Sequence, residues 1–268
     1  MTGTYNIVKN EGGVSEAIGF LLIFSLVVVG IGLVSLYGYP VLLQQQVGAD
    51  QRIMEKNMIV LQNDIKSLTY KNVPYKETSL KVGGGPLTVY NTISNPNTSF
   101  RIMNGSGADV TPPFHPGQLQ YESTGSQQVI AIENGAVMGR RNLEAGSFML
   151  AEPRWFIDTD PVSAKTTAVI YLIGINSTEL LSQTGVGTVK MQMAETNYTE
   201  YIAPSNPITV QYIRDPNNDF SVAWRNYFVN TLKWNETGSD TYQPPPPPIL
   251  PPIDTLVIKR YDIMIKSL

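Results

Sequence analysis

The chain has 268 residues, of which 42% are hydrophobic and only 15% are charged. This length is enough for one or two domains with a real core, and a net charge of −3 gives no basic field for nucleic acid. The absence of cysteine excludes disulfide scaffolds, thiol catalysis and Cys-based metal sites, and a single histidine leaves little material for a His-rich metal site or a Ser-His-Asp triad.

The most apolar part of the sequence is EGGVSEAIGFLLIFSLVVVGIGLVSLYGYP, residues 11–40. Residues 17–39 carry no charge, and as a helix they cover about 35 Å, enough to cross a hydrocarbon core of roughly 30 Å. A buried core helix needs a shorter apolar run. A cleavable secretory signal is also shorter and ends in small residues, where this chain has Tyr37, Tyr39 and Pro40. We therefore predict a retained transmembrane helix with aromatic side chains at the membrane interface.

A distinctive motif lies immediately before this span. A short polar leader ends in Gly12 and Gly13, and Val14 begins the run V-S-E-A-I-G-F that leads into the apolar helix. This arrangement resembles the class III signal of archaeal type IV pilin-like proteins. The resemblance implies that a prepilin-type peptidase removes a leader peptide, residues 1–13, on the cytoplasmic side by cutting between Gly13 and Val14. It also implies that the helix is retained and packs into a filament.

Glu16 is the acid at the edge of the apolar run, and it would be the third residue after that cut. The resemblance implies that an acid near this position pairs with the N-terminal amine of a neighbouring subunit. An unpaired charge is costly in a lipid-like setting, so a partner is expected. A helix N-terminus also favours an acid through the helix dipole, and the two interpretations are compatible. Gly30 and Gly32 would allow neighbouring helices to approach closely in an assembly.

Helical periodicity resumes beyond Pro40, which is expected to kink or interrupt the helix. The apolar residues there form one stripe: Val47, Met54, Met58, Leu61, Ile65 and Leu68. Two interpretations remain open, because the stripe can pack on the protein's own globular domain or against helices of other subunits. Residues 14–69 are predicted to form one transmembrane and stalk helix of roughly 80 Å.

Residues 70–268 are predicted to form a β-rich head domain, because short segments of alternating hydrophobicity dominate there. SLKVGGGPLTVYNT indicates two strands around a glycine turn, and Asn134-Gly135 between two apolar segments is the strongest hairpin signal. We interpret residues 76–213 and 253–268 as one antiparallel domain, a sandwich or a strongly bent sheet. The expected fold class is α+β: a long N-terminal helix followed by an antiparallel, sandwich-like head with one packed helix.

Two segments interrupt the β pattern. RDPNNDFSVAWRNYFVNTLKW begins with the potential cap Asp215-Pro216, and its large apolar residues recur every four positions, which predicts a helix laid on the sheet. A ligand-binding aromatic strip is the alternative. The Pro-rich loop 242–252 predicts an extended polyproline II connector, with a docking site for a proline-binding module as its alternative.

Residues with catalytic or metal-binding potential form no recognisable constellation. Residues 83–86, GGGP, lack the phosphate-binding loop pattern and are interpreted as a turn. Asp158 and Asp160 could share a cation, but acids beside Pro161 favour a turn, and His115 has no second histidine. We therefore expect no enzymatic activity, no cofactor or metal, and neither nucleic acid nor a small-molecule substrate as a partner.

Asn-x-Ser/Thr sequons occur only after the predicted span, at Asn97, Asn104, Asn176, Asn197 and Asn235. They suit glycans on an extracellular domain and orient the precursor with its N-terminus in the cytoplasm. Asn176 follows an apolar strand and is the weakest candidate.

These features favour a structural subunit or minor pilin of an archaeal type IV pilus-like surface filament. Such a subunit is anchored in the membrane, processed by a prepilin-type peptidase and assembled with copies of itself or with other pilins, with its head outside the cell. The alternative is a signal-anchored ectodomain that remains single and binds envelope, sugar or a protein partner.

Overall fold

The structure is a computed structural model of the chain, and it describes residues 11–71, 73–92, 97–141, 146–202, 204 and 206–268, with the backbone alone for residues 11–14. The chain divides into two compact units, residues 1–48 and 49–268. The second unit includes the C-terminal part of the long helix together with all the strands.

The long helix consists of α1 (Glu11–Leu33), a π-helical turn η1 (Val34–Gly38) and α2 (Tyr39–Tyr70). The turn η1 lies directly before Pro40, which has no N–H and whose ring clashes with the carbonyl four residues earlier in a regular α-helix. The Tyr39 N–H donates instead to the Val34 carbonyl, five residues earlier. Pro40 therefore interrupts the regular α-helix, as the sequence predicts, but the helix continues beyond it because the π-helical turn absorbs the mismatch.

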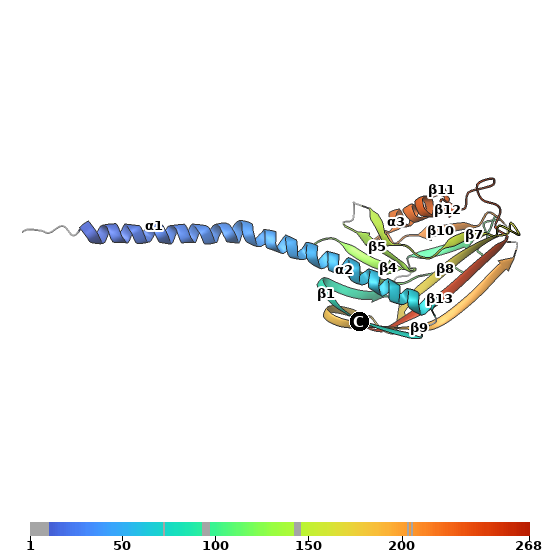
Figure 1. The fold of residues 1–268 in the computed structure, drawn as a ribbon, viewed down its shortest axis with the longest axis horizontal. Coiled ribbons are helices and arrows are strands. Elements are labelled where there is room, and N and C mark those ends of the chain that lie inside the picture. Colours follow the sequence, from blue (N-terminus) through green and yellow to red (C-terminus); the bar gives the residue numbers. More distant parts are fainter. Residues whose placement is uncertain (1–10, 72, 93–96, 142–145, 203, 205) are drawn as a thin grey trace, which may run out of the picture. The chain divides into compact units, whose positions relative to one another are not determined.

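The larger sheet has nine strands in the order β6-β5-β4-β3-β1-β9-β13-β8-β7 (Figure 1). Its strands are β1 (Tyr75–Tyr90), β3 (Gln118–Glu122), β4 (Val129–Glu133), β5 (Ala136–Arg140), β6 (Ser147–Ala151), β7 (Phe156–Thr159), β8 (Thr166–Ser177), β9 (Ser182–Ile202) and β13 (Thr255–Ser267). All neighbouring strands are antiparallel except β13 and β8, which run parallel. The sheet is thus mostly antiparallel, and the exception arises where the last strand inserts between β9 and β8.

The smaller sheet has four strands in the order β11-β12-β10-β2. Its strands are β2 (Ser99–Met103), β10 (Thr209–Ile213), β11 (Asn235–Gly238) and β12 (Thr241–Gln243). The short helix α3 (Ser221–Asn226) and the π-helical turn η2 (Tyr227–Thr231) follow β10. Phe220, Trp224 and Phe228 of this segment are fully buried, which confirms the predicted packed helix.

Two cores cover the two faces of the large sheet. Within β4, Ile130 and Ile132 point into one core, and Val129 and Ala131 point into the other. This follows from the alternation of side chains along a strand. The first core contains α2, and the second contains the aromatic residues of α3 and of the small sheet. The head is therefore layered as helix, large sheet, small sheet with α3, which agrees with the sandwich-like prediction.

The apolar stripe of α2 is buried within the second unit. Its members from residue 54 onward are at most 1% exposed and share a core with seven strands of the large sheet: Met54, Met58, Leu61, Ile65 and Leu68. Of the two interpretations of this stripe, packing on the protein's own domain is the one the structure confirms for these residues.

Two local predictions of strand geometry have opposite outcomes. The Asn134-Gly135 turn joins β4 to β5 with φ of 48° and 74°, as a tight hairpin requires. The expected glycine turn at residues 83–86 is wrong, because β1 runs through it as one strand with a register shift between Val82 and Leu87. A side chain at Gly85 would lie 1.9 Å from the Glu122 carbonyl oxygen, so the glycines serve a close approach of β3 rather than a reversal.

The predicted cap of the helical insert is also wrong. Asp215 belongs to a separate turn, where its carboxylate accepts a hydrogen bond from the Asn217 N–H at 2.9 Å. α3 begins at Ser221, whose N–H donates to the Asp219 carboxylate at 2.7 Å. The residue directly before the helix is Phe220, which makes no side-chain cap, so no Asp occupies the predicted capping position.

Candidate membrane anchor and surface sites

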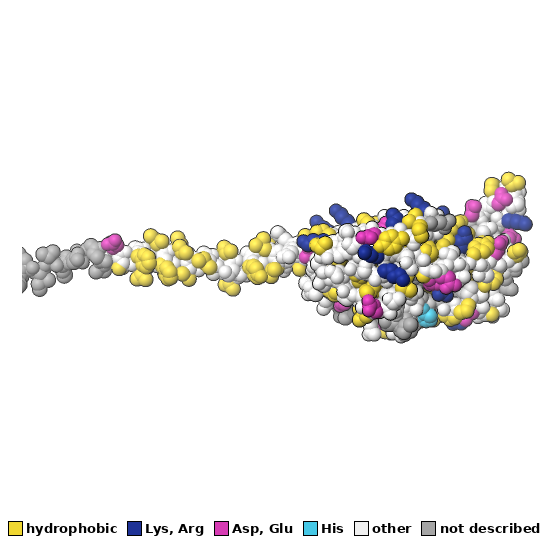
Figure 2. Space-filling view, turned by 90° about the horizontal axis from the view of Figure 1, so that it is seen from below, with side chains coloured by type: hydrophobic (Ala, Val, Ile, Leu, Met, Phe, Trp, Pro, Cys, Tyr) yellow, Lys and Arg dark blue, Asp and Glu magenta, His cyan; other side chains and the backbone are white. Residues whose placement is uncertain are grey.

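The apolar part of the long helix is uncovered on all sides. None of its most apolar window is buried, and Leu26 and Leu36 are 75% and 71% exposed. Figure 2 shows hydrophobic side chains along the whole of this segment. A helix satisfies its own backbone hydrogen bonds, so an apolar helix of this length and composition is consistent with a membrane anchor.

The few polar and small residues of this anchor fit an apolar environment. The Ser25 hydroxyl donates to the Leu21 carbonyl at 2.7 Å, which satisfies it without water. Side chains built at Gly30 and Gly32 would meet nothing within 4 Å. Residues two apart on an α-helix differ by about 200°, so these glycines lie on opposite faces. Gly19 lies within about 20° of Gly30, and Ser25 within about 20° of Gly32, so small residues occur on both faces.

The predicted processing and pairing residues lie at the start of α1. Gly12, Gly13 and Val14 are within the helix, which begins at Glu11, and residues 1–10 of the expected leader lie outside the described residues. Glu16 is exposed, and no basic group of the described chain lies within 4.0 Å of it. A cut after Gly13 would leave the apolar helix intact, with Glu16 in its first turn.

The sequons differ in accessibility. Asn97, Asn197 and Asn235 are exposed. Asn104 is half-buried, and its side-chain oxygen accepts hydrogen bonds from the backbone of residues 106 and 108 at 3.1 and 3.0 Å. Asn176 is half-buried within β8. The three exposed residues are therefore the most accessible candidates for glycans.

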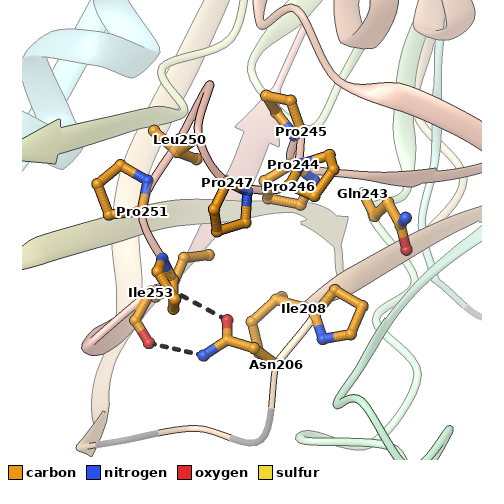
Figure 3. Close-up of a pocket in the computed structure, with 12 residues that line it drawn as sticks. Asn206, Ile208, Gln243, Pro244, Pro245, Pro246, Pro247, Leu250, Pro251 and Ile253 are labelled. Atoms are coloured by element: carbon orange, nitrogen blue, oxygen red, sulfur yellow. Dashed lines mark hydrogen bonds between the residues drawn. The ribbon is translucent and has the colours of Figure 1, made fainter.

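The Pro-rich loop 242–252 is not a straight rod. The Ile249 N–H donates to the Pro246 carbonyl at 3.1 Å, and this turn is incompatible with a continuous polyproline II helix, which has no internal hydrogen bonds. The side chain of Asn206 holds the end of the loop by donating to the Ile253 carbonyl at 3.0 Å and accepting from the Ile253 N–H at 3.2 Å (Figure 3). The loop therefore folds back over a groove of about 240 Å³ and connects β12 to β13.

The isolated titratable residues have structural roles. The Asp160 carboxylate accepts hydrogen bonds from the Val162 N–H at 2.9 Å and the Ser163 hydroxyl at 2.6 Å, which is the turn interpretation. His115 contacts the Thr98 carbonyl through Nδ1 at 3.0 Å. Within the described ranges, no group of three or more His, Asp or Glu side chains is arranged to hold a metal ion.

A polar cavity of about 250 Å³ in the β-rich unit was not predicted from the sequence. Gln118, Gln120 and Glu122 of β3 line it, and they alternate with Leu119 and Tyr121, which belong to the core shared with α2. The remaining lining residues come from β1, β4, β5 and the turn after β10: Tyr90, Val129, Arg140, Asp215, Asn217 and Asn218. The only local signal was the alternation of QLQYE, because the partners of these residues lie far away in the sequence.

A fully buried carboxyl group fixes the amides of this cavity. Glu133 accepts hydrogen bonds from Trp224 Nε1 at 2.8 Å and from the Gln118 amide nitrogen. Asn218 Nδ2 donates to Gln118 Oε1 at 3.1 Å and to Gln120 Oε1 at 2.7 Å. Burial raises the pKa of Glu133 to about 7, although the hydrogen bonds from Gln118 and Trp224 act in the opposite direction. The orientation of three carboxamides is therefore set by the fold.

Comparison with known proteins gives one match. No curated protein and no solved structure matches the chain. Residues 13–266 match the model of a family of unknown function, DUF7289, and the match covers the apolar helix and the β-rich unit together. The chain therefore belongs to DUF7289, a family of unknown function.

Proposed function

We propose that this protein is a structural subunit or minor pilin of an archaeal type IV pilus-like surface filament. The observation that carries the proposal is the uncovered apolar helix, in which Glu16 is the one acid that remains after a cut at Gly13 and no further charge follows before Asp50. Such a surface is covered by lipid in the precursor, and in a filament it is covered by the helices of other copies. The subunit is processed between Gly13 and Val14, and its head lies outside the cell.

The glycine faces of α1 support assembly rather than a solitary anchor. Gly30 and Gly32 face opposite sides of the helix, and small residues let helix backbones approach closely. A helix with a close-approach surface on each side contacts at least two neighbours, as a subunit inside a filament does. A dimer needs only one such face, and a solitary anchor needs none.

The first test is the mature N-terminus. Mass spectrometry of the chain extracted from native membranes is expected to show Val14 as the first residue. Gly13→Val is expected to block processing and leave the full-length precursor in the membrane, whereas the control Gly3→Val in the same leader is processed normally. Normal maturation of Gly13→Val would contradict the peptidase assignment.

The second test concerns the acid. Glu16→Ala is expected to leave membrane insertion intact and to abolish or strongly reduce filaments in sheared surface material viewed by electron microscopy, because the N-terminal amine of the next subunit loses its partner. Glu16→Asp, which keeps the charge, is expected to retain partial assembly. Unchanged filaments in Glu16→Ala would remove the pairing role.

The alternative is a single anchored ectodomain that binds envelope, sugar or a protein partner. It predicts no filaments containing this chain in surface material, and a monomer after gentle extraction. Immunogold labelling of sheared filaments separates the two functions, because only a filament subunit labels along the fibre.

A further inference from the structure

We propose that the polar cavity lined by β3 and the turn 215–218 binds one sugar residue of a neutral saccharide. The inference does not depend on the filament proposal, because the cavity lies entirely within the β-rich unit.

The charges of the cavity favour a neutral ligand. Arg140 supplies one positive charge, and Asp215 and Glu122 supply two negative ones. These three groups together carry a net negative charge, which repels an anion, and the buried guanidinium opposes a cation at close range. The mixture of signs also gives no large single-sign field to attract an ionic ligand from a distance.

The polar groups of the cavity match hydroxyl groups. Gln118, Gln120, Asn217 and Asn218 each carry a carboxamide, which offers both donors and an acceptor. A sugar hydroxyl likewise donates one hydrogen bond and accepts others. The network anchored on Glu133 holds three of these amides in place, so a ligand does not have to pay for ordering them.

Two buried polar atoms in the lining residues have no partner within the described chain. Arg140 is 7% exposed, and its Nε is unpaired, while its terminal nitrogens both lie 3.4 Å from the Asn217 carbonyl oxygen. The buried Oδ1 of Asn218 is also unpaired. Leaving such groups unpaired costs about 1–3 kcal/mol each. One is a donor and the other an acceptor, and both residues line the cavity.

The size and apolar surface of the cavity indicate how much of a saccharide it takes. Its volume of about 250 Å³ is near the lower end of ligand pockets, which start at roughly 300 Å³. This suits one sugar ring rather than a peptide or a longer glycan segment. Tyr90 and Val129 supply the apolar surface on which the C–H face of a ring can lie.

The test uses the full chain, made without glycosylation and held in phosphatidylcholine nanodiscs, so that no sugar detergent competes. Saturation-transfer NMR and calorimetry measure the methyl glycosides of glucose, galactose, mannose and N-acetylglucosamine, with glucuronate and glucosamine as charged counterparts. At least one neutral glycoside is expected to bind with a Kd of about 1 mM. No binding of any neutral glycoside at about 10 mM, or tighter binding of a charged counterpart, would overturn the proposal.

Variants locate the site. Arg140→Gln and Asn218→Leu are each expected to weaken binding about tenfold or more, because each removes a polar group offered to the ligand. Arg52→Gln, at an exposed residue of α2, is the matched control and leaves binding unchanged.

Thermal unfolding of each variant checks the fold. If Arg140→Gln does not fold, the half-buried Asn218 decides the question through Asn218→Leu. Unchanged affinity in folded Asn218→Leu would place the saccharide elsewhere, and that result contradicts the proposal.

Discussion

The long helix contains two apolar regions in opposite environments. From Ile18 to Leu43 the large apolar side chains surround the helix, and they are mostly exposed. From Met54 to Leu68 most of them form one stripe that is buried in a core with the strands, whereas Val60 lies outside this stripe and is 47% exposed. What covers a helix therefore depends on the spacing of its apolar residues as well as on their number. A one-sided stripe is covered by its own domain, whereas an all-round apolar surface needs lipid or other subunits.

The largest expected effect separates these two regions directly. Leu61→Ala is expected to lower the free energy of unfolding of the β-rich unit by about 2–5 kcal/mol, because it leaves a cavity in a packed core. Leu26→Ala, the matched change in the exposed region, is expected to leave that free energy unchanged. Denaturant unfolding of both variants in nanodiscs measures these two free energies. Equal losses in the two variants would contradict the assignment of the two apolar regions to different environments.

Glu133 is expected to make the free energy of unfolding of the β-rich unit depend on pH. The pKa of Glu133 is raised from 4.5 to about 7 in the folded state, so between these values the folded protein holds a proton that the unfolded chain releases. The free energy of unfolding therefore falls as the pH rises through this window. At ~1.36 kcal/mol per pKa unit, the loss is bounded at roughly 3 kcal/mol, with no further loss above pH 7.

Glu133→Gln tests this sign. The Gln side chain cannot ionise. The free energy of unfolding of the variant is therefore not expected to show this decrease between about pH 5 and about pH 8. Denaturant titrations of the wild-type protein and the variant at both pH values give the comparison. A wild-type protein that becomes more stable toward pH 8, while the variant shows no such rise, would reverse the assigned shift.

The smallest expected change in stability comes from substituting single glycines. Gly135→Ala is expected to cost about 1–2 kcal/mol, because Gly135 has φ of 74° and L-residues avoid this region. Gly30→Ala is expected to cost the β-rich unit nothing, yet to reduce assembly by filling a close-approach face of α1. Unfolding measurements and filament counts on both variants show whether Gly135 acts in folding and Gly30 in assembly.

The parts of the fold that could be predicted from the sequence are those that depend on local sequence patterns. The helix from residue 14 to 69 follows from an apolar run and an amphipathic stripe, and the Asn134-Gly135 hairpin follows from the φ values that a tight turn needs. The parallel pairing of β13 with β8 could not be predicted, because it joins segments separated by almost ninety positions. The prediction of a turn at residues 83–85 was wrong because glycine is favoured both in a β-bulge and in a turn that reverses the chain, and here β1 has a register shift instead.

The candidate sites divide in the same way. The anchor was visible because length and apolar composition are properties of one continuous segment. The polar cavity was not, because its residues come from four strands and a turn, and only the fold brings Gln118 close to Asn218. The predicted cap at Asp215 was wrong because its carboxylate belongs to a separate turn with the Asn217 N–H, several residues before α3 begins at Ser221.

The most direct test of the central claim is cross-linking in the apolar helix, which is clean because the chain has no cysteine. Ile23 and Ser25 lie about 200° apart on α1, on the faces of Gly30 and Gly32 respectively. Ile23→Cys and Ser25→Cys are each expected to give disulfide dimers in native surface material, and the double variant is expected to give a ladder of higher multimers. Dimers alone in the double variant, or no cross-links from either single variant, would contradict a filament held together by this helix.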